Sequence, residues 1–247
     1  MERHNKHLTE YTKFGDVYGL LDKAIESKKK FSVVILKHVL EHVLDPKDLL
    51  GRLKALVSEN CVLIVVVPND FSALQLKLLN EKKITPFWIN PIEHLSYWAR
   101  DGLERFVDEN GYNVLNYTSD YPVDFDLLVK HTNYNRNKTV GRYSHLKRVR
   151  VTNLLCKQSA AECNEYYHSL AKMGMGMLPP YCTCPSVLYA WRWQTLLQCY
   201  LVLIEYLQGP PWYVLAIANS PPQDYKPRHA RMALGWPAGL PDTIVFA

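Results

Sequence analysis

The stretch FSVVILKHVLEHVLDP, residues 31–46, contains the features that decide the fold. Its first six residues are an apolar run rich in β-branched side chains, and a second run, CVLIVVV, covers residues 61–67. Runs without polar alternation are typical of strands buried on both faces of a parallel sheet. Between them, Asp45 and Pro46 are suited to begin a helix. The apolar stripe of that helix comprises Leu49, Leu50, Leu53, Leu56 and Val57. The sequence therefore predicts one right-handed βαβ crossover.

Polar side chains follow both predicted strands at the point where each strand ends. Lys37 and His38 come directly after the first strand, and Asn69 and Asp70 follow the second. The carboxyl ends of parallel strands meet at one edge of a sheet, and open α/β sheets bind ligands at that edge. The side chains expected to lie together there are His38, Glu41, His42, Asn69 and Asp70. A polar loop without a ligand is the alternative, and topology alone does not decide between the two.

Residues 38–42, HVLEH, also match the H-x-x-E-H signature of inverted zinc metalloproteases. That signature holds zinc when both histidines lie on one face of a continuous helix and a third ligand follows. Here it directly follows a predicted strand, and the next helix begins only near Asp45. We therefore expect His38 and His42 to lie in a turn, and we assign no metal site from the sequence. A zinc hydrolase stays a remote alternative.

The remainder of the chain divides at Gly176. Before it, the pattern predicts a helix over about 99–110 that ends at Gly111, a strand at 113–118, a short helix near 124–130 and a long helix over about 144–172. After it, ten of the 15 prolines and four of the six tryptophans fall within residues 177–247. Paired prolines interrupt regular elements there. We expect residues 1–176 to form one domain and 177–247 a poorly ordered region with a final strand at 243–246.

Composition and charge narrow the functional classes. The net charge of +5 is mild and the six cysteines are irregularly spaced, with no signal-type apolar segment at Met1, so we expect reduced thiols in a cytoplasmic protein. Polar and charged residues interrupt the apolar stretch 186–207, which argues against a membrane span. A basic cluster lies within residues 136–150; we interpret it as a solvated helix start and do not expect a nucleic-acid partner.

Several motifs, in their order and spacing, resemble class I S-adenosylmethionine-dependent methyltransferases. A buried strand followed by HVLEHVLDP resembles the fourth-strand region of that family, and VPNDFS at 67–72 resembles the loop after their fifth strand. PIEHLSY at 91–97, followed by a helix and NGY at 110–112, is similar to the stretch around their last helix. The likeness covers about residues 11–176. It implies an α/β, Rossmann-like fold with a mostly parallel seven-stranded sheet flanked by helices.

The resemblance also implies a reaction and a cofactor side. The family transfers a methyl group from S-adenosylmethionine to a nucleophile by in-line displacement, a reaction in which positioning does most of the work. By resemblance, Leu36, Lys37 and His38 lie beside the methionine part of the cofactor. Asp16, within FGDV at 14–17, matches an acidic residue that accepts a hydrogen bond from the adenine amino group. An ordinary loop aspartate is the alternative for Asp16.

The acceptor side follows from the same resemblance. His94 and His42 are the candidates for acid/base catalysis, and Asn69 and Tyr97 are the candidates for substrate contact. For each, a loop residue that only makes local hydrogen bonds is the alternative. The acceptor implied for these residues is a small molecule, whose identity the sequence does not give.

Two motifs of the family are missing. Its glycine-rich loop after the first strand, and the acidic residue that ends its second strand, have no counterpart here, because Gly15 and Gly19 are isolated. We therefore expect an N-terminally incomplete domain with an unpaired central strand and weak or absent cofactor binding. The family also reaches its last strand soon after the equivalent of Gly176, whereas we expect a long, irregular extension first. The alternative function is a non-catalytic interaction module, docked on a partner subunit that completes the sheet.

Overall fold

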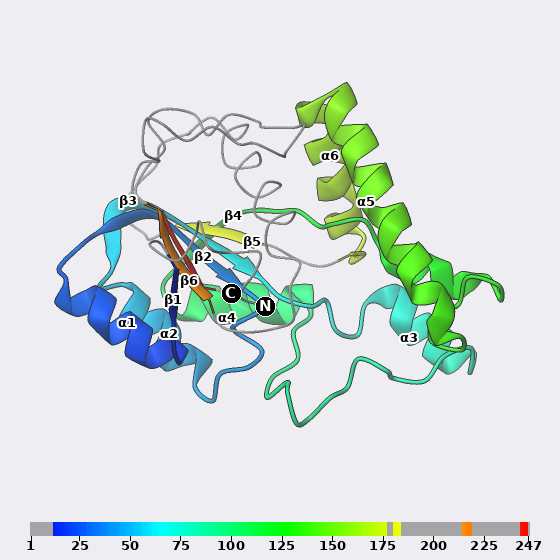
Figure 1. The fold of residues 1–247 in the computed structure, drawn as a ribbon, viewed down its shortest axis with the longest axis horizontal. Coiled ribbons are helices and arrows are strands. Elements are labelled where there is room, and N and C mark those ends of the chain that lie inside the picture. Colours follow the sequence, from blue (N-terminus) through cyan, green and yellow to red (C-terminus); the bar gives the residue numbers. More distant parts are fainter. Residues whose placement is uncertain (1–11, 177–179, 184–213, 219–242, 247) are drawn as a thin grey trace.

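The computed structural model describes residues 12–176, 180–183, 214–218 and 243–246, and its seven strands form one sheet (Figure 1). The strands are β1 (Thr12–Phe14), β2 (Phe31–Lys37), β3 (Val57–Val66), β4 (Asn113–Tyr117), β5 (Pro180–Thr183), β6 (Val214–Ala218) and β7 (Thr243–Phe246). Their order across the sheet is β1-β6-β7-β2-β3-β5-β4. The chain thus places the two strands anticipated most clearly, β2 and β3, side by side near the centre.

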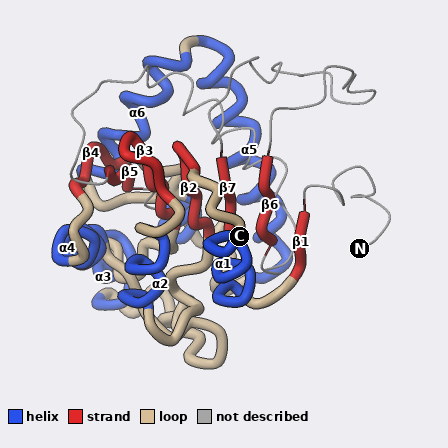
Figure 2. Tube along the Cα trace, turned by 90° about the vertical axis from the view of Figure 1, so that its left-hand side faces the viewer, coloured by secondary structure: helices blue, strands red, loops and turns tan. Residues whose placement is uncertain are grey.

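Six α-helices and two 3₁₀ helices accompany the sheet in the described part of the chain. They are α1 (Val17–Glu26), α2 (Pro46–Leu53), α3 (Ala73–Asn80), α4 (Arg100–Glu109), η1 (Val123–Leu128), η2 (Lys138–Val140), α5 (Gly141–Gln158) and α6 (Ala160–Lys172). Figure 2 shows α1, α2 and α4 together beneath the sheet and α6 on its other side. This α/β arrangement confirms the predicted fold class.

The central strands are parallel, as the βαβ crossover predicts. β2 and β3 pair in parallel from Val33↔Val62 to Lys37↔Val66. β7 pairs in parallel with the other edge of β2, from Val33↔Thr243 to Leu36↔Phe246. The outer pairs, β1 with β6, β6 with β7, β3 with β5 and β5 with β4, are antiparallel. The parallel part of the sheet therefore consists of β7, β2 and β3.

The expectation of an unpaired central strand is wrong, because β7 occupies the edge of β2 that the sequence left open. An open strand edge presents unpaired N–H and C=O groups, and a β-branched segment such as Thr243–Phe246 can satisfy them. β5 follows Gly176 closely and lies between β3 and β4, so a strand is present where the extension was expected to be irregular. The division of the chain at residue 176 stays a prediction.

Helix α2 forms where its capping signals predict. The Asp45 carboxylate accepts a hydrogen bond from the Asp48 N–H at 2.9 Å, and Pro46 is the first helical residue. Leu49, Leu50 and Leu53 are fully buried against the sheet, each burial contributing about 1.5–3 kcal/mol. The predicted stripe runs past the helix, because α2 ends at Leu53, Leu56 lies in the turn that follows and Val57 already begins β3.

Helix α4 also agrees with its prediction. Gly111 follows its C-terminal end with φ of +77°, a conformation that glycine adopts without strain. Tyr112 is buried beside it, and its hydroxyl donates to the Leu50 carbonyl at 2.8 Å, which ties α4 to α2. These helices and the lower face of the sheet enclose the main hydrophobic core.

Two helical predictions need correction. The single helix expected over 144–172 is broken at Ser159, whose backbone is extended and whose hydroxyl accepts from the Glu162 N–H at 3.2 Å. Serine followed three residues later by glutamate is a capping pattern, so a new helix begins there. The short helix expected near 124–130 is the 3₁₀ helix η1.

No helix in the described ranges is both long and apolar enough to cross a membrane. The 186–207 stretch lies outside those ranges.

Candidate functional site at the carboxyl edge of β2 and β3

The two parallel strands bring the segments that follow them into contact. The His38 N–H donates to the Val66 carbonyl at 2.9 Å, continuing the ladder to the last residues of both strands. His38 then adopts a φ of +54°, which is uncommon for a residue with a side chain and costs about 1–2 kcal/mol. This conformation turns the chain sharply away from the sheet. Residues 38–44 form turns rather than a helix, as predicted, so the helical context of the zinc-protease pattern is absent.

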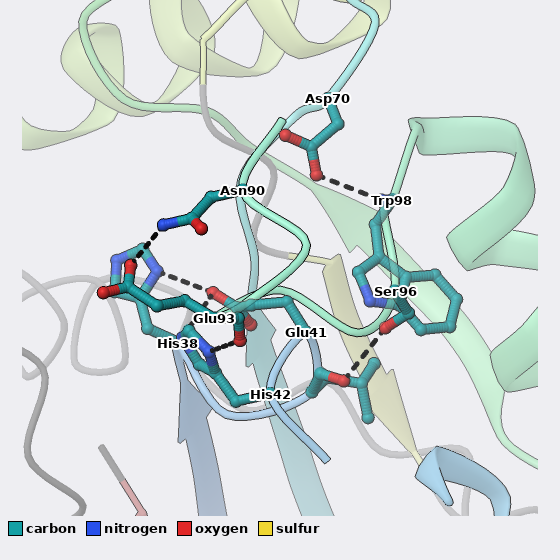
Figure 3. Close-up of polar contacts among 9 residues, drawn as sticks. His38, Glu41, His42, Asp70, Asn90, Glu93, Ser96 and Trp98 are labelled. Carbon is teal, nitrogen blue, oxygen red and sulfur yellow. Dashed lines mark hydrogen bonds and ion pairs between the residues drawn. The ribbon is translucent and has the colours of Figure 1, made fainter. Parts of the chain in front are cut away.

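Glu41 lies at the centre of this edge (Figure 3). Its side chain is fully buried, and its Oε1 lies 3.1 Å from Nδ1 of His38 and 3.9 Å from Nε2 of His42. Its Oε2 has no hydrogen-bond partner among the described residues. The Glu41 carbonyl accepts from the Leu95 N–H at 2.8 Å, which attaches the loop before α4 to the turn after β2. A buried carboxylate is therefore held between two loops with one oxygen unsatisfied.

The same loop brings His94 to the edge. The imidazole rings of His94 and His42 lie 4.9 Å apart and nearly perpendicular, and Nδ1 of His42 lies 2.6 Å from the Glu93 carbonyl. Nδ1 of His94 is buried and lacks a partner within the described ranges, and burial lowers the pKa of His94. The His94 ring is 6.0 Å from that of Tyr97, whose buried hydroxyl also has no partner there.

Asn69 and Asp70 complete the edge from the β3 side. The Asn69 amide donates to the Gly174 carbonyl at 2.8 Å. This bond connects the loop after β3 to the residues that follow α6. Asp70 is almost fully buried; its carboxylate accepts from the Trp98 N–H at 3.3 Å, and its own N–H donates to the Trp98 carbonyl at 2.8 Å (Figure 3). Burial raises the Asp70 pKa to about 6, the Trp98 N–H acts in the opposite direction, and Glu41 adds a further upward push.

The residues predicted for the cofactor side have different surroundings. Lys37 is partly buried, and burial lowers its pKa, with a further contribution from Arg148. The Leu36 side chain is fully buried in the core, so it offers no side-chain surface to a ligand. His38 remains about one-third exposed beside Glu41.

Asp16 lies at the same end of the sheet as this edge but several strands away from it. It follows β1, which is separated from β2 by β6 and β7, and three strand spacings correspond to about 14 Å. Its carboxylate accepts from the Gly19 N–H at 2.9 Å and caps α1. A role in binding adenine stays a prediction for this residue.

Most of the side chains at this edge can be predicted from the sequence, but the backbone groups that fix them cannot. The Glu93 carbonyl orients His42, and the Trp98 backbone clamps Asp70. Neither contact leaves a signal in the sequence, because any residue type supplies the same backbone atoms. The chemical result is a group of carboxylate oxygens and imidazole nitrogens at the carboxyl end of a parallel sheet, able to bind a cation or to exchange protons.

The basic cluster around 136–150 is partly used within the fold. Lys147 forms an ion pair with Asp126, and Arg148 lies 3.1 Å from Asp120. Arg136 donates from Nε to the Lys83 carbonyl at 3.1 Å. These contacts hold α5 and the preceding loop against their neighbours, so the three residues have structural partners of their own.

Comparison with known proteins bears directly on this edge. Residues 4–117 match a family model described as a methyltransferase domain. This match supports a class I S-adenosylmethionine-dependent methyltransferase family for residues 4–117. The methyltransferase match includes β2, α2, β3, α4 and β4, together with both loops that supply the site. Residues 118–247 lie beyond the match. A search of curated proteins finds none that matches the chain.

The position of β5, outside the matched residues, agrees with the methyltransferase resemblance. The methyltransferase resemblance predicts a last strand soon after Gly176, and β5 begins at Pro180, between β3 and β4. The match does not assign a role to any single residue at the carboxyl edge of β2 and β3.

Proposed function

We propose that this chain is an S-adenosylmethionine-dependent methyltransferase domain whose ligands bind at the edge after β2 and β3, and that the 247-residue chain binds the cofactor only weakly by itself. The observation that supports the first part is the parallel register of β2 and β3, which ends with the His38 N–H on the Val66 carbonyl. It places the loops of both strands at the edge where this type of sheet binds ligands.

The chain's own residues divide this edge into two sides. Lys37 ends β2 and His38 follows it directly, and both are proposed to lie beside the methionine part of the cofactor. His94 and Tyr97 lie in the loop before α4 and His42 lies in the turn after β2; these three are proposed to meet a small-molecule acceptor. When bound, S-adenosylmethionine supplies an electrophilic methyl group. The side chains on the acceptor side orient the nucleophile and take up its proton if it carries one.

Weak binding is proposed because the sequence contains no G-x-G-x-G motif. Glycines in that motif let the backbone approach a nucleotide-type cofactor closely, and their absence removes those contacts. The alternative of a non-catalytic module relied on an open β2 edge for a partner subunit to cover. Since β7 pairs with that edge, the structure offers this alternative less support.

Titration of the full chain with S-adenosylmethionine and S-adenosylhomocysteine tests both parts. Calorimetry should give no saturable binding at micromolar ligand. At millimolar ligand, amide NMR signals of Lys37 and His38 should shift, while that of Tyr143 on the exposed surface of α5 should not. Micromolar affinity would contradict the weak-binding part. A chain that shows no shift at either residue at millimolar ligand would contradict the proposed cofactor position.

A further inference from the structure

Glu41, His42 and His94 form a compact group of three potential metal ligands, which we call the EHH cluster. Each offers one ligand atom, and these atoms all lie within 4.8 Å of one another. Two ligands come from the turn after β2 and the third from the loop before α4. The Leu95 N–H bonded to the Glu41 carbonyl at 2.8 Å holds these two segments together.

The Glu41 carboxylate of the EHH cluster is buried with fewer hydrogen-bond partners than its two oxygens can accept. Glu41 has no exposed surface, Nδ1 of His38 lies 3.1 Å from its Oε1, and its Oε2 has no hydrogen-bond partner in the described part of the chain. Buried carboxylates are normally paired, hydrogen-bonded or bound to a metal. One oxygen of Glu41 is therefore available for a cation.

The orientation of His42 points to the same conclusion. A backbone carbonyl can only accept a hydrogen bond, so the contact of 2.6 Å between Nδ1 of His42 and the Glu93 carbonyl requires a proton on Nδ1. In the neutral ring Nε2 then carries a lone pair, and it lies 3.9 Å from Oε1 of Glu41. Metal-bound histidines are commonly oriented by a carbonyl on the opposite nitrogen in this way.

His94 supplies the third group from a distant part of the sequence. Its ring lies 4.9 Å from that of His42, and its Nδ1 is buried with no partner that the described residues provide. A buried imidazole nitrogen without a hydrogen bond is uncommon in folded proteins. A nitrogen of this ring and an oxygen of the Glu41 carboxylate are among the ligand atoms that lie within 4.8 Å of one another, so one cation can contact both residues.

We propose that the EHH cluster binds one divalent transition-metal ion through a carboxylate oxygen of Glu41, Nε2 of His42 and a ring nitrogen of His94. Two imidazoles and one carboxylate suit Zn²⁺, Mn²⁺ or Fe²⁺, whereas Mg²⁺ and Ca²⁺ prefer oxygen ligands. Zinc bonds to these atoms are about 2.0–2.2 Å long, which in a tetrahedral site separates ligand atoms by about 3.4 Å. The three ligand atoms now lie within 4.8 Å of one another, so side-chain rotations must bring them closer together by about 1 Å.

This site uses the residues of the H-x-x-E-H pattern differently, because only one of the two histidines, His42, is a ligand and Glu41 is a ligand as well. His38 belongs to that pattern but contacts Oε1 of Glu41, so it orients the carboxylate and is not a ligand. His94 takes its place from 52 residues further along the chain than His42. Three protein ligands leave a coordination position open, as in catalytic rather than structural zinc sites. With an ion bound there, the two imidazoles would act on the acceptor through the metal and not as free bases.

Metal titration of the full chain tests this assignment without any cofactor, so its result is independent of the proposed methyl transfer. The protein is stripped with a chelator and titrated with Zn²⁺ against a chromophoric competitor, and with Co²⁺ followed by its absorption. We expect one equivalent of metal, and a Co²⁺ spectrum without a thiolate charge-transfer band. His94→Ala and Glu41→Gln should each weaken binding at least tenfold.

Matched controls separate loss of a ligand from general damage. His131→Ala and Glu104→Gln change exposed residues of the same types outside the cluster and should leave the affinity unchanged. Circular dichroism of the metal-free variants checks that they fold, and His94 is suited to this because it lies in a loop. Equal affinity of the unaltered chain and His94→Ala, a thiolate band in the Co²⁺ spectrum, or no binding by the unaltered chain would each overturn the proposal.

Discussion

The βαβ unit has an apolar half below the sheet and a polar half at the carboxyl edge. Both halves are buried, but burial has opposite effects on their stability. Below the sheet, Leu49, Leu50 and Leu53 are packed with no exposed surface, and they need no specific partner. At the carboxyl edge, Glu41 and Asp70 are equally buried, yet Glu41 keeps an unsatisfied oxygen and Asp70 a raised pKa. Burial stabilises the first half and penalises the second. Such penalised groups are typical of functional sites.

The largest effect that tests this contrast is expected from the apolar half. Leu50→Ala should lower the free energy of unfolding by about 2–5 kcal/mol, because it removes a fully buried side chain and leaves a cavity. Urea unfolding followed by circular dichroism measures the change. The matched control, Leu44→Ala, alters a leucine that is 88% exposed and should change stability by less than about 0.5 kcal/mol. Similar losses in the two variants would remove the contrast.

An intermediate effect of opposite sign is expected at Asp70. Its folded pKa of about 6 exceeds the ordinary 3.8, so the folded state binds the proton more tightly than the unfolded state. Stability should therefore fall as pH rises from about 4 to 6, and the cost persists above pH 6. Asp70→Asn removes this cost and should stabilise the fold by about 1–3 kcal/mol at pH 7.5, with little gain at pH 4.

The measurement for Asp70 is urea unfolding at the two pH values. Asp101→Asn, which changes a carboxylate 74% exposed on α4, is the control and should show no comparable pH-dependent difference. The interpretation fails if Asp70→Asn is destabilising at pH 7.5, because the carboxylate would then contribute more through its bond to the Trp98 N–H than burial costs it.

The smallest effect is expected at the boundary of the two halves. Asp45 caps α2 through its bond to the Asp48 N–H, and Asp45→Ala should cost about 0.5–2 kcal/mol in thermal or urea unfolding. Glu104→Ala, in the exposed surface of α4, serves as the control. The cap affects helix stability and not the site, so metal titration of Asp45→Ala should match that of the unaltered chain. A weaker affinity would show that the edge depends on α2 more than its contacts suggest.

The sequence allowed prediction of the features that local chemistry determines. β2, β3, α2 and the Gly111 turn follow from apolar runs, caps and a glycine, and the parallel pairing then places His38, Glu41, His42 and Asp70 at one edge. Topology is sufficient there because the carboxyl ends of adjacent parallel strands must meet.

The remaining features depend on contacts between distant segments. The path of the loop carrying His94 is fixed by backbone bonds such as Leu95 N–H to the Glu41 carbonyl, which no residue pattern encodes. The pairing of β7 with β2 joins residues more than 200 positions apart, and a short β-branched segment gives no information on its partner. The break at Ser159 was visible as a capping pattern, but the longer apolar periodicity concealed it.

The partnership of β2 and β7 has a consequence for biosynthesis. β2 and β3 can pair early, since only α2 separates them, but the second flank of β2 is covered only after Thr243–Phe246 has been made. Until then a nascent chain on the ribosome carries an apolar strand with one free edge, and long-range pairing of this kind is slow. Synthesis of Thr243–Phe246 therefore controls when the middle of the sheet becomes protected from aggregation.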